Sequence, residues 1–88
     1  MRFTTIRLCG GKALMAVPAE ELDLDLARVA DALEKGGVAV KKRDEMMVVA
    51  EWGGAEATIY SQGKIMFFPM KDKAACVRNA LEILETVK

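Results

Sequence analysis

Residues 55–68 read AEATIYSQGKIMFF and predict a β-hairpin. Two runs rich in β-branched and aromatic residues flank Gln62-Gly63, and Gly63 suits the left-handed position of a tight turn. The two faces of this hairpin are then Ile59, Ile65 and Phe67 on one side and Tyr60, Met66 and Phe68 on the other. Both faces are apolar, which is typical of strands that are covered on both sides.

The patterns around this hairpin predict the element order β(β)-α-β-β-β-β-α. Strands are expected at residues 2–9, 12–17, 38–43, 46–52, 55–61 and 64–70. Helices are expected at residues 25–35 and 72–87, with Asp23 or Asp25 capping the first and Asp72 the second. The Gly36-Gly37 pair should end the first helix.

This order predicts a single α+β domain over residues 1–88, with residues 1–18 forming an N-terminal strand or hairpin extension. We expect an antiparallel sheet of five to six strands with two helices packed on one face. Two helices cover only one face of such a sheet, so the apolar second face needs another explanation. Residues 1–18 are one candidate cover, and a partner or ligand is the other.

The hairpin and the elements around it resemble one repeat of the TATA-box-binding protein (TBP) family. ATIYSQGKIM, residues 57–66, with a helix following from Asp72, is similar to the family's strand–Ser-x-Gly-Lys–strand–helix signature. Upstream, Leu24-Asp25-Leu26 resembles the Leu-Asp-Leu that opens the family's first helix. The resemblance covers residues 24–88 and implies a TBP-like fold.

In that family two repeats form a saddle whose concave sheet binds and bends the DNA minor groove. The resemblance implies phosphate contacts at Lys41, Lys42 and Lys64, with Tyr60 at a position that wedges between bases. Arg43 stands where the family has a second wedging phenylalanine, and the only asparagine of the chain lies outside the expected strands. This chain holds one repeat, so a saddle would need two copies.

Composition narrows the chemistry that the chain can perform. The 13 basic and 13 acidic side chains cancel, and histidine is absent. We therefore expect no metal site, no cofactor and no enzymatic activity, because Cys9 would lack a histidine to activate it. Cys9 and Cys76 are expected to be reduced, buried, apolar side chains. No apolar stretch is long enough to span a membrane, and we expect a cytoplasmic protein.

Three functions follow from these expectations. The first is an interaction domain whose open sheet face contacts a second copy or another protein. Its expected interaction residues are Met47, Val49, Tyr60, Met66 and Phe68. The second is nucleic-acid binding by a dimeric TBP-like saddle, using Lys41, Lys42, Arg43, Tyr60 and Lys64. The third is a small apolar ligand held on the sheet.

Overall fold

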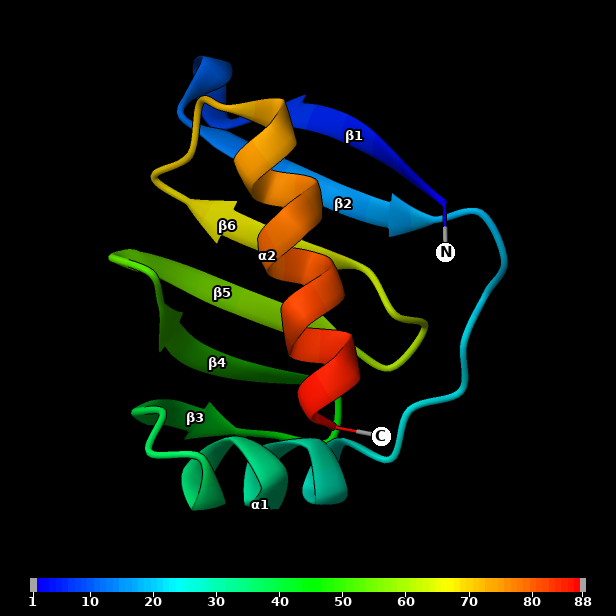
Figure 1. Cartoon of the computed structure of the whole chain (residues 1–88), viewed down its shortest axis with the longest axis vertical. Coiled ribbons are helices and arrows are strands. Elements are labelled where there is room, and N and C mark those ends of the chain that lie inside the picture. The colour runs from blue at the N-terminus through cyan, green and yellow to red at the C-terminus, as the bar shows by residue number, and fades with distance from the viewer. Residues whose placement is uncertain (1, 88) are drawn as a thin grey trace.

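The computed structural model describes residues 2–87, which form an antiparallel six-stranded sheet with two α-helices on one face (Figure 1). The strands are β1 (Phe3–Leu8), β2 (Ala13–Pro18), β3 (Val40–Arg43), β4 (Met47–Trp52), β5 (Ala55–Tyr60) and β6 (Ile65–Phe68). The helices are α1 (Leu26–Lys35) and α2 (Lys73–Thr86). The strand order across the sheet is β1-β2-β6-β5-β4-β3. The predicted α+β class, the antiparallel sheet and both helices are therefore confirmed.

Both helices begin at an aspartate that caps the first turn. A side-chain oxygen of Asp25 accepts hydrogen bonds from the backbone N–H groups of Ala27 (3.1 Å) and Arg28 (3.4 Å). Asp72 does the same for Ala74 (2.9 Å) and Ala75 (3.2 Å). These bonds satisfy N–H groups that have no partner within the helix. Asp25, rather than Asp23, is thus the cap of α1.

The core lies between the sheet and the two helices. Alternate residues of the four inner strands point into it, because successive side chains of a strand face opposite ways. The fully buried strand residues of this layer include Leu14, Ala16, Val48, Ala57, Ile59, Ile65 and Phe67. The helices contribute Leu26, Val29, Ala30, Leu33, Cys76, Ala80, Ile83 and Leu84. Ile59, Ile65 and Phe67, which the alternation places together on one side of the hairpin, all face this core.

The N-terminal hairpin widens the sheet instead of covering its second face. β1 pairs only along β2, and β2 pairs with β6, so both strands lie in the plane of the sheet (Figure 1). The chain then passes along the sheet to α1. On the way, the N–H groups of Leu22 and Leu24 donate to the backbone oxygens of Gln62 and Ser61, both at 2.9 Å. The face opposite the helices, named here the open face, is thus left uncovered by residues 2–87.

The two cysteines lie in different environments. Cys76 is buried in the core, as expected, whereas Cys9 is exposed, so the prediction that both are buried is wrong for Cys9. Cys9 begins the short 3-10 turn Cys9–Gly11 that joins β1 to β2, with a backbone φ of 54°. A turn at the rim of the sheet has no second layer over it, so this side chain stays in solvent.

Candidate interaction face

A single row of paired residues crosses the open face from one edge of the sheet to the other. The row, named here the central row, consists of Ile6, Met15, Met66, Thr58, Val49 and Lys42. Residues that pair directly across antiparallel strands point to the same side, so these six side chains share one face. Four of them are large and apolar. Thr58 at the centre is only 5% exposed, because its larger neighbours on adjacent strands surround it.

The five expected interaction residues all lie on this face. Val49 and Met66 belong to the central row, and Phe68 lies two residues beyond Met66 on β6. Tyr60 and Met47 pair with each other beside the row. Phe68 is 42% exposed, and the other four side chains are partly exposed. An apolar surface that is continuous over neighbouring strands marks an interaction site more often than scattered exposed residues do.

The apolar surface extends further than the sequence indicated. Ile6 and Met15 add the two N-terminal strands to it, and Ile6 is 45% exposed. A signal was present in residues 13–17, ALMAV, because a strand that is apolar at every position places apolar side chains on both faces of the sheet. The position of β2 beside β6 could not be inferred locally, since that pairing joins residues about fifty positions apart.

The outline of the molecule, which sets the upper limit for the open face, has the size of a protein interface. The molecule extends over 30 × 26 Å in the plane viewed in Figure 1. Stable protein interfaces bury roughly 800 Å² on each partner, which is comparable with this outline. By contrast, a hollow of about 440 Å³ lies on the helix-bearing side, between Asp25, Arg43 and Val48. A broad apolar face of a sheet suits a protein surface better than it suits a small ligand, which binds in a concave pocket.

Carboxylates neutralise the basic residues at one end of the open face. The Nζ atom of Lys41 lies 3.4 Å from Glu51 and 3.5 Å from Glu56, which pair across β4 and β5. The side-chain hydrogen bonds and the charges of these two glutamates raise the pKa of Lys41. Lys42 lies 3.8 Å from Asp44. Phosphate binding at Lys41 and Lys42 would therefore have to compete with ion pairs that already exist.

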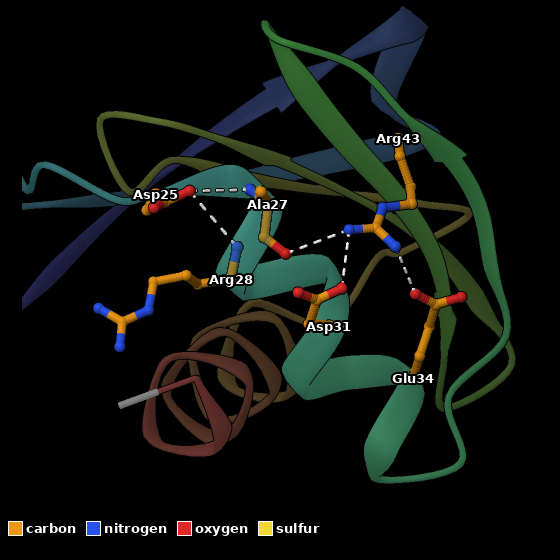
Figure 2. Close-up of polar contacts among 6 residues, drawn as sticks. All are labelled: Asp25, Ala27, Arg28, Asp31, Glu34 and Arg43. Carbon is orange, nitrogen blue, oxygen red and sulfur yellow. Dashed lines mark hydrogen bonds and ion pairs between the residues drawn. The ribbon is translucent and has the colours of Figure 1, made fainter.

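Arg43 lies on the opposite side of the sheet from Lys41 and Lys42. Its guanidinium donates to Asp31 (2.8 Å), Glu34 (2.8 Å) and the backbone oxygen of Ala27 (3.3 Å) (Figure 2). All three acceptors belong to α1. A one-residue irregularity between Val40 and Lys42 causes this division, because it changes which side the following residues face. Arg43 thus ties α1 to β3 and does not share the open face with the other expected nucleic-acid ligands.

Tyr60 and Lys64 flank the turn between β5 and β6. The Tyr60 N–H donates to the Lys64 backbone oxygen at 2.9 Å, and the two residues close the hairpin. Lys64 continues the outward alternation of Met66 and Phe68, so it lies at the rim of the open face. Among residues 2–87 it makes no ion pair within 4.0 Å. Of the five expected nucleic-acid ligands, Lys41, Lys42, Tyr60 and Lys64 therefore share this face.

Groups that could perform catalysis or bind a metal ion are dispersed. Within residues 2–87, no three carboxylate or cysteine side chains gather closely enough to hold a metal ion. Burial raises the pKa of the Cys76 thiol, which disfavours the reactive thiolate. Neither helix of this part of the chain has the length and hydropathy needed to cross a membrane.

Comparisons with models of protein families, with curated proteins and with solved structures find no match to this chain. Function is therefore inferred from the surface chemistry of the chain.

Proposed function

We propose that this chain is a non-catalytic interaction domain that buries its open face against the open face of a second copy. The observation that carries the proposal is the central row. Its apolar side chains Ile6, Met15 and Met66 lie side by side on the neighbouring strands β1, β2 and β6. Burial of apolar area is the main favourable term in protein association, at roughly 25 cal/mol per Å² before the costs of association.

The charges around the row are compatible with self-association. Lys41 and Lys42 each lie within 4 Å of at least one carboxylate, so neither presents an uncompensated positive charge to a second open face. A two-fold axis parallel to the sheet would place the same patch on both sides of the contact, as in most homodimers. Two stacked sheets would then enclose the apolar side chains in a layer about 10 Å thick.

A charged residue at the centre of the face tests this proposal. Met66→Lys should halve the particle mass measured by light scattering after size-exclusion chromatography, because burying an unpaired ammonium costs several kcal/mol. Met46→Lys is the matched control. Met46 is 70% exposed in the turn between β3 and β4, outside the central row, so its substitution should leave the mass unchanged.

The particle masses of the wild type and of Met66→Lys decide the result. A halved mass for Met66→Lys, with an unchanged circular dichroism spectrum, supports contact through the open face. Equal masses for the wild type and Met66→Lys over a dilution series would contradict it.

The second candidate function is nucleic-acid binding by a TBP-like saddle built from two copies. The observation that favours it is the presence of Tyr60, Lys42 and Lys64 on the open face. The element order within residues 24–88, α-β-β-β-β-α, is also the one that the resemblance to a TBP repeat implies. Stacking of Tyr60 on bases and contacts of the two lysines with phosphates would supply the affinity.

Salt dependence tests this second candidate. Binding of a fluorescent DNA duplex should weaken steeply between about 50 and 200 mM salt, and Lys64→Ala should reduce the salt slope by about one. Lys35→Ala is the control, because Lys35 ends α1 on the other side of the sheet. Binding that is absent, or equally weakened by both substitutions, would reject nucleic acid as the ligand of this face.

A further inference from the structure

The sheet has two outer edges, and only one of them is protected against pairing. The β3 edge is four residues long, contains the irregularity between Val40 and Lys42, and carries adjacent lysines. Short length, bulges and lysines are the features by which native proteins block the pairing of an edge strand. No second chain is expected to add to the sheet along β3.

The β1 edge has none of these features. Its six residues, FTTIRL, pair with β2 in one continuous register from Phe3 to Leu8. Arg7 is its only charged residue, and Thr4, Thr5 and Ile6 are β-branched residues that favour strands. In Figure 1 no other described segment lies beside the outer side of β1.

The backbone groups available at this edge follow from the ladder between β1 and β2. The Ala19 N–H donates to the Arg2 oxygen at 2.8 Å, so Arg2 belongs to a hydrogen-bonded pair. Hydrogen-bonded and non-bonded pairs alternate along an antiparallel ladder. Phe3, Thr5 and Arg7 therefore direct their N–H and C=O groups outward. The pairing of Phe3 with Pro18, which has no N–H to donate, agrees with this assignment.

We propose that a second copy of this chain pairs antiparallel along β1, with the two-fold axis at Thr5. In that register Thr5 faces Thr5 of the second copy, and Phe3 faces Arg7. All the outward groups of these residues then find partners, in about six backbone hydrogen bonds. The facing side chains also match, since Thr–Thr and Thr–Ile pairs stabilise sheets and no two charges of like sign meet.

The neighbouring register with the axis at Ile6 is less favourable. It would place Phe3 opposite Cys9, whose φ of 54° takes the backbone out of the extended conformation. The hydrogen bonds at both ends of the shared ladder would then be lost. The Thr5-centred register is thus the one that the backbone of β1 supports best.

This contact is independent of the open face. A two-fold axis perpendicular to the sheet leaves all four helices on one side and both open faces on the other. The edge pair would therefore form one continuous sheet from two copies, with its apolar face still free. If the edge contact and the face-to-face contact both form, the expected particle is a tetramer of the 9.6 kDa chain, with two kinds of interface.

Proline at position 5 tests the edge contact. Thr5→Pro removes an N–H that points away from β2, so the ladder within the chain stays intact, and proline is tolerated on an edge strand. Thr5→Ala is the matched control, because it removes the same hydroxyl but keeps the N–H. We expect Thr5→Pro to halve the particle mass and Thr5→Ala to leave it unchanged.

Combining this substitution with Met66→Lys separates the two contacts. If both exist, each single variant halves the wild-type mass and the double variant is a monomer. If only Thr5→Pro lowers the mass, the edge contact stands and the face contact fails. If only Met66→Lys lowers it, or if the wild type is a monomer, the edge contact is overturned.

Amide exchange of the unaltered protein gives a second measurement, which does not depend on how the variants fold. The amides of Thr5 and Arg7 should exchange at least about ten times more slowly at concentrations where the protein associates than after dilution. Exchange that is equally fast in both conditions would overturn the proposal.

Discussion

Gly63 occupies a crowded position at the turn between β5 and β6. Its φ is 98°, and a Cβ atom there would lie 2.9 to 3.2 Å from three side-chain atoms of Leu22. Leu22 is itself held by the hydrogen bond from its N–H to Gln62, so it cannot move away freely. Gly63→Ala should lower the free energy of unfolding by roughly 2–3 kcal/mol, through backbone strain and the displaced leucine.

Gly54→Ala is the control for that prediction. Gly54 also turns a hairpin with a positive φ, 83°, but no atom lies within 4 Å of the added Cβ. Its substitution should cost about 1 kcal/mol, from strain alone. Urea denaturation measures both values, and equal losses would show that contact with Leu22 does not matter.

Cys76 should make the stability of the protein sensitive to alkaline pH. Burial raises its thiol pKa in the folded chain above the ordinary value of 9.0. The unfolded chain therefore releases this proton first, and the stabilisation that is fully present below pH 9.0 is lost as the pH rises toward the folded pKa. The free energy of unfolding, measured with urea under reducing conditions, should fall above that pH.

Cys76→Ala provides the comparison for this pH dependence. The variant will be less stable at every pH because it leaves a cavity, so the slope with pH is the quantity to compare. The slope above pH 9.0 should be shallower than in the wild type. An identical slope would assign the alkaline loss to other groups, among them Lys41, whose raised pKa has the same sign of effect from pH 10.5 upward.

At the scale of elements, Arg43 joins α1 to the edge strand β3 by ion pairs with Asp31 and Glu34. The three side chains are about half exposed, so solvent screens the pairs and each contributes little. Arg43→Met should lower the free energy of unfolding by about 0.5–1 kcal/mol, and less at high salt. A double-mutant cycle with Glu34→Gln measures the coupling between the two residues.

The same variant separates a structural role of Arg43 from a ligand-binding role. Because its guanidinium lies on the helix side, Arg43→Met should leave both particle mass and any binding of DNA unchanged. A loss of DNA affinity with unchanged stability would instead assign Arg43 to the binding surface.

The helices and strands could be predicted from the sequence because local chemistry defines them. Aspartates at positions 25 and 72 cap the helices, glycines form the turns, and alternation identified the inward face of the hairpin. The observed element bounds differ from the expected ones by at most two residues. The orientation of the basic cluster at residues 41–43 could not be predicted, because an irregularity of one residue determines which of its side chains share a face and leaves no mark in composition.

On the scale of the whole molecule, the sequence predicted an apolar face that two helices could not cover. It did not determine where the N-terminal hairpin lies. That placement depends on the pairing of β2 with β6, which local patterns do not encode. The hairpin could have closed the open face; in the structure it enlarges that face and supplies a new edge.

Self-association should also appear in thermal unfolding. If the folded chain associates and the unfolded chain does not, the Tm should rise by roughly 3–6 °C for each tenfold increase in concentration. The double variant Thr5→Pro, Met66→Lys should show a Tm that does not change with concentration. A concentration-independent Tm for the wild type, measured by scanning calorimetry, would contradict both contacts.

The difference between the two edges also limits how far such a sheet can grow. A strand that could add to β1 and another that could add to β3 would let copies join end on end into a fibril of unlimited length. If β1 pairs as proposed, and the irregularity and lysines of β3 block the other edge, the sheet formed by residues 2–87 has no edge left at which to grow. The extra residue in β3, Lys41, would then stop further growth of the sheet. A change that made β3 a regular strand would open the second edge and lower the solubility of the protein.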